Sequence, residues 1–151
     1  MASTAPNIIE LSGDEITALL ARNRVGRIAY AMHDRVDIEP LHYVYHDGWI
    51  YARTSRGAKL ATIERNKWVA FEVDEVSSLF DWRSAVVHGG VYAILPDSNP
   101  ESRELFEKAL QLLRRLLPAT FREDDPVPNR DVIIRIAVQE ATGRRAISPS
   151  D

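Results

Sequence analysis

The chain has 151 residues, of which 45% are hydrophobic, and a formal net charge of −3 at pH 7. This length is typical of one domain, and no apolar run approaches the roughly 20 residues that a membrane-spanning helix needs. The absence of cysteine excludes disulfides, thiolate metal sites, iron–sulfur clusters and cysteine nucleophiles, so redox chemistry would require a bound cofactor.

We therefore expect residues 1–151 to form one domain. Acidic and basic residues are interspersed, which gives no basic face for a nucleic-acid backbone, and we expect neither nucleic acid nor a membrane as partner. Residues 1–7 have neither a basic start nor an apolar stretch of a secretory signal, so the expected location is the cytoplasm.

The first periodic segment predicts a helix over residues 13–23. Ser12 and Glu15 have the spacing of a capping box, and a stripe of apolar residues at helical intervals follows them. The short segment before it, residues 1–10, is expected to be a flexible tail.

After residue 25 the apolar period changes to two, which is typical of strands. The Asp47-Gly48 pair is a strong hairpin signal between two of them. Pro40 lacks an N–H and would break a ladder bond, so it marks a bend or an edge position. Three antiparallel strands are expected here: 25–32, 36–45 and 49–54.

The second half of the chain adds another helix and the remaining strands. Gly89-Gly90 interrupts a long strand and predicts a bulge or sharp coil. A proline at residue 100 suits the first turn of a helix, which Pro118 ends. The strands expected here are 68–73, 82–95 and 131–139, with an acidic, proline-rich loop over 121–129 and a flexible tail over 143–151.

Short connections between consecutive strands favour antiparallel pairing, because parallel pairing would require long crossovers. The resulting fold class is mainly β, or α+β: a six-stranded antiparallel barrel with flanking helices.

The segment most informative about function lies where the strand 49–54 gives way to a helix. Arg53, Thr54, Ser55, Gly57 and Lys59 bring hydroxyl donors, cations and a helix N-terminus together, an arrangement that suits phosphate. Spacing alone equally allows a plain turn in which Ser55 caps the helix and the basic side chains are solvated.

Three runs resemble successive signatures of the pyridoxamine 5′-phosphate oxidase-like FMN-binding proteins, specifically their nitroimidazole-reductase-like branch. They are IYARTSRGAKL (residues 50–60), WVAFEVD (68–74) and WRSAVVHG (82–89). The opening LSGDEITALLARNRVGR (11–27) and the closing Thr142-Gly143-Arg144 are also similar, so the resemblance covers nearly the whole chain.

The resemblance implies an FMN-binding split barrel that forms a homodimer with the cofactor at the subunit interface. It implies an oxidoreductase acting on a small molecule. Two alternatives remain open: a reductase of the same barrel that uses a deazaflavin, and a flavin- or haem-binding module without turnover.

The resemblance also implies cofactor-binding residues, in three groups. The phosphate turn matches Arg53, Thr54, Ser55 and Lys59. The strand beside the isoalloxazine ring matches Pro40, Leu41, His42 and Tyr43. Trp82 and Ser84 match positions that reach the flavin across the dimer interface. No catalytic residue is assigned, since the flavin itself would carry the chemistry.

The spacing of His42 and His46 is that of a helical zinc motif, but their strand context predicts a separation of roughly 13 Å. The two side chains therefore cannot grip one metal, and we expect no metal site. His42 remains open to two interpretations, a flavin or substrate contact and an ordinary strand side chain.

Overall fold

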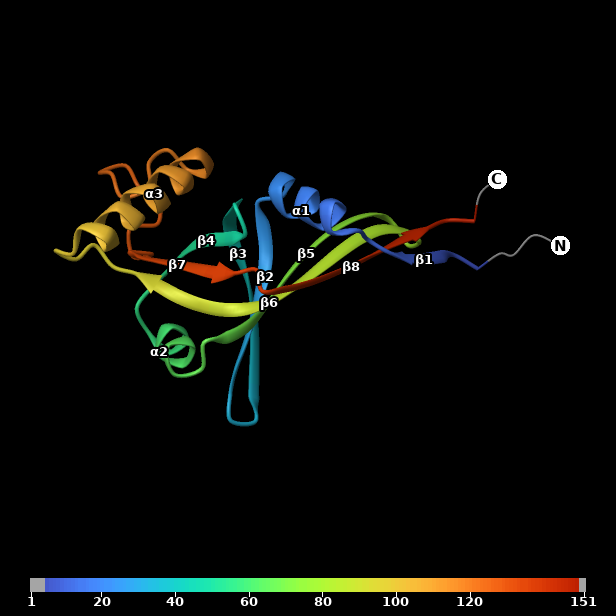
Figure 1. Ribbon diagram of the computed structural model, residues 1–151, viewed down its shortest axis with the longest axis horizontal. Helices are drawn as coiled ribbons and strands as arrows, with labels where there is room; N and C mark the ends of the chain where they lie inside the picture. Colours follow the sequence, from blue (N-terminus) through green and yellow to red (C-terminus); the bar gives the residue numbers. More distant parts are fainter. Residues whose placement is uncertain (1–4, 150–151) are drawn as a thin grey trace.

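The computed structural model describes residues 5–149. Eight strands and three helices lie in this part of the chain (Figure 1). In chain order they are β1 (Asn7–Glu10), α1 (Gly13–Arg22), β2 (Val25–Met32), β3 (Arg35–His46), β4 (Trp49–Thr54), α2 (Ala58–Arg65), β5 (Trp68–Ser78), β6 (Asp81–Ile94), α3 (Pro100–Leu116), β7 (Val132–Ala137) and β8 (Glu140–Ile147).

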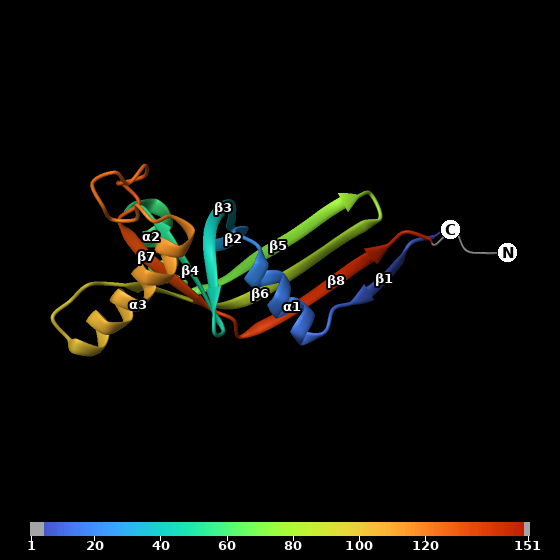
Figure 2. The same ribbon diagram turned by 90° about the horizontal axis from the view of Figure 1, so that it is seen from above.

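The predicted antiparallel barrel is confirmed. Among the described strands, β6, β5, β2, β3, β4 and β7 pair in that order, and β7 pairs back with β6, which closes the ring. β8 and then β1 continue the sheet outward from β6 (Figure 2). No helix in the described part of the chain is long and apolar enough to cross a membrane.

The local signals that set the helix and turn positions are confirmed. Ser12 accepts from the Glu15 amide and Glu15 accepts from the Ser12 amide, which completes the capping box of α1. Pro100 occupies the first turn of α3. Asp47 and Gly48 both have positive φ, at 48° and 82°, which is the geometry of a two-residue hairpin turn.

β6 belongs to both the ring and the outward extension. Its first half, Trp82 to His88, pairs with β8, and its second half, Val91 to Ile94, pairs with β7. Of the two features predicted at Gly89-Gly90, a bulge or a sharp coil, the bulge is wrong, because the ladder with β5 runs unshifted there and shifts only between Val76 and Ser78. The glycines instead mark where β6 changes partner.

The expected flexible tails are also wrong where the structure describes them. Residues 7–10 form β1, which pairs with residues 144–147 of β8, and β8 pairs in turn with β6. Residues 1–4 and 150–151 of those two predictions lie outside the described residues. β5 also runs past its predicted end at residue 73, to Ser78.

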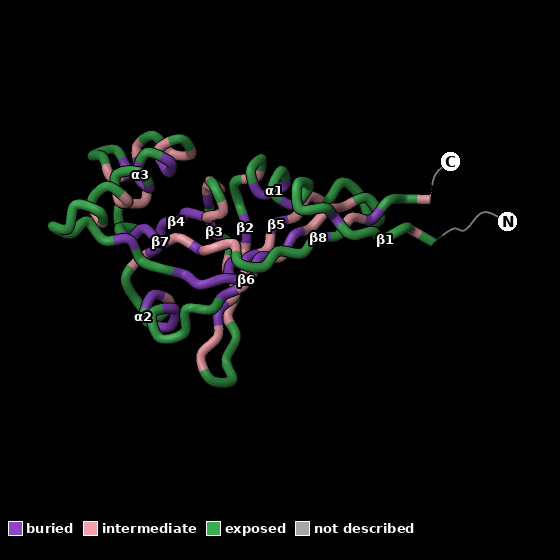
Figure 3. Tube along the Cα trace, in the orientation of Figure 1, coloured by how far each residue is buried: buried purple, intermediate pink, exposed green. Residues whose placement is uncertain are grey.

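β4 is buried on both of its faces (Figure 3). Ile50 and Ala52 point into the barrel core with Tyr43 and Phe71. Tyr51 points the other way, into a second apolar cluster that α3 covers. Because side chains alternate along a strand, the residues that end β4 also face different compartments.

Candidate functional site

A cavity of about 250 Å³ lies where β4 ends and α2 begins. We call it the β4–α2 cavity; it is lined by Leu41, Arg53, Thr54, Ser55, Arg56, Gly57, Ala58, Lys59 and Arg130. It exists because β3 pairs with β4 only from Tyr43 to His46, so the strands part before Arg53 and Thr54. The edge of β3 before Tyr43 therefore has no β4 partner.

Thr54 lines this cavity and has an unsatisfied polar group. Its side chain is buried, with 2% of the residue exposed, and its Oγ1 has no hydrogen-bond partner among the described residues. Buried hydroxyls nearly always have a partner, so an unpartnered one on a residue that lines a cavity is a candidate ligand contact.

The N-terminus of α2 faces the same cavity. Gly57, the residue before the helix, has a φ of 155° and gives it no side-chain cap, so Ser55 does not cap this helix as the plain-turn interpretation expected. The first amides of a helix have no intrahelical acceptor and carry partial positive charge. They are free to bind an anion in the β4–α2 cavity.

Lys59 is held in place by an ion pair. Its Nζ contacts Oε1 of Glu39 on β3, and the other oxygen of that carboxylate lies 3.4 Å from the Tyr30 hydroxyl. The Lys59 side chain is only 18% exposed, whereas Arg56 beside it is 75% exposed. An anion in the cavity would meet a positioned ammonium group, in competition with Glu39.

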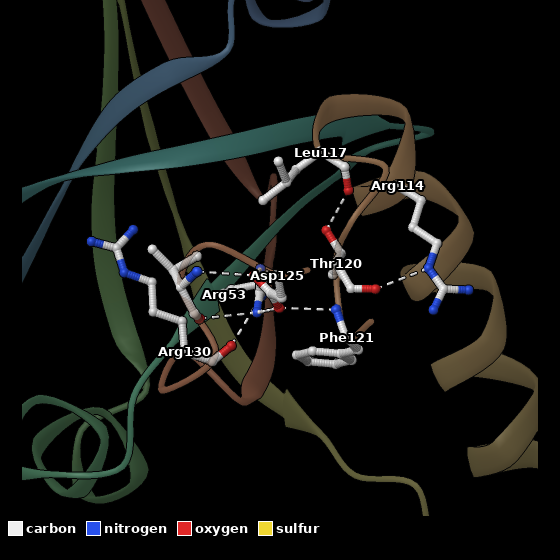
Figure 4. Close-up of polar contacts among 8 residues, drawn as sticks. Arg53, Arg114, Leu117, Thr120, Phe121, Asp125 and Arg130 are labelled. Carbon is white, nitrogen blue, oxygen red and sulfur yellow. Dashed lines mark hydrogen bonds and ion pairs between the residues drawn. The ribbon is translucent and has the colours of Figure 1, made fainter. Parts of the chain in front are cut away.

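Arg53 is fully engaged by the loop that follows α3 (Figure 4). Its guanidinium lies 3.3 and 2.5 Å from the two oxygens of Asp125, and it donates to the carbonyls of Arg130 at 2.9 Å and Val127 at 3.3 Å. The Cζ atom of its guanidinium also lies 4.7 Å from the centre of the Phe121 ring. Arg53 thus positions this loop, and direct contact with a phosphate stays a prediction.

Asp125 is the centre of that loop. Besides Arg53 it accepts from the amides of Phe121 at 2.9 Å and Val127 at 3.0 Å. Hydrogen bonds from the Arg53 guanidinium, and then from the two amides, lower the pKa of Asp125 to about 2. The carboxylate is therefore charged throughout the physiological range.

A larger cavity, of about 640 Å³, lies on the other side of Arg53. We call it the α3 cavity; it is lined by Arg24, Val25, His42, Arg53, Leu113, Leu116, Leu117, Thr120, Pro126, Val127 and Arg130. It shares Arg53 and Arg130 with the β4–α2 cavity. Sequence reasoning missed it because its walls come from segments far apart in the chain.

The four cofactor-binding residues predicted on β3 lie in different surroundings. Leu41 lines the β4–α2 cavity and His42 the α3 cavity. Pro40 lies in the ladder opposite Arg27. Tyr43 is a core residue whose amide donates to the Arg24 carbonyl and whose hydroxyl donates to the Leu20 carbonyl. Burial raises the pKa of Tyr43.

Trp82 and Ser84 lie apart from both cavities within one chain. They are on the first half of β6, in register with residues 146 and 144 of β8. Figures 1 and 2 both show the β5–β6 hairpin projecting away from α2. No group of three or more His, Cys, Asp or Glu side chains in the described chain is placed to hold a metal ion.

A comparison with known protein families shows to which family the chain belongs. A family profile described as pyridoxamine 5′-phosphate oxidase matches residues 12–145. The chain belongs to this family. The matched residues include all those that line the two cavities and every strand from β2 to β7.

Solved structures agree with the family assignment. A protein from Mesorhizobium loti described as FAD-binding is 28% identical, with a TM-score of 0.75, over 93% of this chain and 99% of its own. A putative pyridoxamine 5′-phosphate oxidase from Corynebacterium glutamicum is 25% identical, with a TM-score of 0.69, over 94% and 99%.

A more distant likeness is one of fold alone. A putative 5-nitroimidazole antibiotic resistance protein from Bacteroides thetaiotaomicron is 16% identical, with a TM-score of 0.68, over 95% of this chain and 93% of its own. Among curated proteins, none matches the chain.

Proposed function

We propose that this family member binds a flavin, with the phosphate end of the cofactor in the β4–α2 cavity. The observation that carries the proposal is the buried Thr54 hydroxyl, which has no partner among the described residues, on a residue that lines one cavity with the N-terminus of α2 and Lys59. A phosphate accepts hydrogen bonds from all three kinds of donor. The Mesorhizobium loti protein, described as FAD-binding, supports a flavin as the ligand.

FMN is the flavin that we assign to the site. Its phosphate is a terminal monoester, which matches a cavity of about 250 Å³ lined by the N-terminus of α2 and by Lys59. The edge of β3 before Tyr43, which lacks a β4 partner, offers backbone groups of Leu41 and His42 beside the ring. FAD, with a second phosphate and an adenosine, would need further room.

The proposed activity is that of an oxidoreductase acting on a small molecule. A bound flavin supplies hydride or electron transfer. The chain's own residues bind the phosphate, orient the ring along β3 and exclude water from it. No side chain of the β4–α2 cavity is required as an acid or base.

We also propose that two copies of the chain share the site. Trp82 and Ser84, which the family resemblance relates to the flavin, lie on the projecting β5–β6 hairpin and do not line the β4–α2 cavity. A second chain would bring that hairpin to the cavity. A flat ring buried between two small barrels is better shielded from water than one held by a single barrel.

Replacing Thr54 by valine tests the phosphate site. The change removes the hydroxyl and keeps the shape of the side chain, so we expect FMN affinity to fall by about 1–3 kcal/mol, roughly 5- to 150-fold. The free energy of unfolding without flavin should stay the same or rise, because the lost hydroxyl is buried and has no partner to leave unpaired. Flavin fluorescence titration and urea unfolding measure the two quantities.

Thr62→Val is the matched control, since Thr62 is a buried threonine of α2 that does not line the β4–α2 cavity. Equal FMN affinity of the wild type and Thr54→Val would reject the phosphate site.

The absorption spectrum of the isolated protein separates the cofactors: a flavin spectrum supports the proposal, while a haem Soret band, or binding of a deazaflavin alone, contradicts it. Tighter binding of FAD than of FMN would correct the choice of flavin.

A further inference from the structure

The α3 cavity has the size and lining of a small-molecule site. Its volume of about 640 Å³ lies within the range usual for ligand pockets, and its wall is mainly apolar. Two leucines at the C-terminal end of α3 and the leucine that follows the helix line it, with valine and proline side chains of β2 and of the loop after α3. The leucines are Leu113, Leu116 and Leu117, and the other residues are Val25, Pro126 and Val127.

The wall is held in place by hydrogen bonds of its own (Figure 4). The Thr120 hydroxyl donates to the Leu117 carbonyl at 2.6 Å, and Arg114 donates to the Thr120 carbonyl at 3.0 Å. The Arg53–Asp125 ion pair fixes the far end of the loop. A cavity whose wall is already fixed costs little ordering when a ligand binds.

Cations without partners border this apolar space. Arg24 and Arg130 are exposed, and neither guanidinium has a hydrogen bond or ion pair within the described chain. Nearby arginines differ, since Arg22 pairs with Glu75 and Arg27 with Glu72. Among the described lining residues there is no aspartate or glutamate, although the whole chain carries a net charge of −3.

We propose that the α3 cavity binds the substrate, and that this substrate is a small, largely apolar molecule with one carboxylate. The leucine wall takes the apolar body, and Arg24 and Arg130 take the carboxylate, for which a guanidinium is the preferred partner. His42 and Arg53 place the ligand beside the proposed flavin site. The role in turnover rests on the proposed function, whereas the ligand class rests on the lining residues.

The test compares 2-naphthoate with the neutral 2-naphthalenemethanol, which has a similar apolar body. Calorimetric titration of the flavin-loaded protein should show the acid binding about tenfold more tightly than the alcohol, the gain expected from one charge-assisted hydrogen bond. Arg24→Gln should remove this preference. Arg65→Gln, a change of an exposed arginine of α2 that lines neither cavity, should keep it.

Two variants then separate this inference from the flavin proposal. Arg24→Gln should leave FMN affinity unchanged. Thr54→Val should lower FMN affinity and leave the affinity for 2-naphthoate unaffected. A failure of the flavin proposal would appear as unchanged FMN affinity in Thr54→Val, with the preference for the acid intact.

Any one of three results would overturn the inference itself. The first is equal affinity for the acid and the alcohol, and the second is an Arg24→Gln variant that prefers the acid as Arg65→Gln does. The third is binding of 2-naphthoate only when flavin is absent. The last result would assign the α3 cavity to the cofactor itself.

Discussion

Arg53 and Asp125 bring opposite charges into the interior, with side chains 8% and 2% exposed. Removing such charges from water is costly, and their attraction offsets the cost only when the remaining donors and acceptors are satisfied. In this pair the remaining donors and acceptors are satisfied, because the guanidinium also donates to two carbonyls and the carboxylate also accepts from two amides. The pair therefore fixes one conformation of the loop that separates the two cavities.

Asp125→Asn leaves the Arg53 cation buried without its counter-charge, and we expect the free energy of unfolding at pH 7 to fall by about 3 kcal/mol. In the wild type the stabilisation is present above the ordinary pKa of 3.8 and is lost as the pH falls through about 2, so the difference between the proteins should narrow in strong acid. Urea unfolding at several pH values measures it.

Asp131→Asn is the control, because Asp131 is 54% exposed and lies 3.9 Å from Arg56; its effect should stay within about 0.5 kcal/mol. An equally small effect of Asp125→Asn would mean that the ion pair does not hold the loop.

At this scale the sequence predicts part of the site. Thr54, Ser55 and Lys59 follow one another at a strand end and helix start, so local spacing is enough to bring them together. The partner of Arg53 lies 72 residues away, and nothing in the local pattern indicates it. The acidic loop at 121–129 was predicted as a surface loop, yet it supplies a buried carboxylate.

At the scale of elements, β6 lies close to a neighbouring backbone at Gly89. A Cβ added there would lie 1.7 Å from the Ala137 carbonyl oxygen, at the end of β7. Real contacts never come so close, so the two strands would have to separate. Glycine is needed here for its lack of a side chain.

We expect Gly89→Ala to lower the free energy of unfolding by about 2–3 kcal/mol, the range for overpacking of a tight contact. Gly13→Ala is the control, because a Cβ at that position of α1 meets nothing within 4 Å. Its effect should be neutral or stabilising by about 0.5 kcal/mol. Thermal unfolding of both variants checks the prediction; equal melting temperatures would contradict it.

The sequence predicts elements that carry their own local signals and misses those that depend on distant partners. The capping box and the Asp47-Gly48 turn are local. β1 is only four residues long and exposed throughout, and the end of β8 has few apolar residues; the two strands arise from pairing with each other and with β6. Strand formation depends on such neighbours more than on intrinsic preference.

For the molecule as a whole, the projecting β5–β6 hairpin is the feature that a second copy would cover. Its end exposes three apolar side chains: Val76 is 68% exposed, Leu79 78% and Phe80 43%. Exposed apolar groups gathered in one place commonly mark a contact surface.

Leu79→Glu should convert the proposed dimer into a monomer, because a charge cannot be buried there without a partner. The circular dichroism spectrum should not change, since the side chain packs against little within its own chain, and FMN affinity should fall with the dimer. Sedimentation at micromolar concentration measures the change.

Leu95→Glu is the control, as Leu95 is also exposed, at 54%, but lies beyond the far end of β6. A monomeric wild type would reject the shared site, and a dimer in both variants would reject this hairpin as its interface.

The change of partner along β6 has a consequence for how the molecule opens. Amide protons in its first half that bond to β8 exchange with solvent when the outer extension detaches, which needs no change in the ring. Amide protons in its second half that bond to β7 exchange only when the ring itself breaks. A single continuous strand therefore reports two separate opening equilibria.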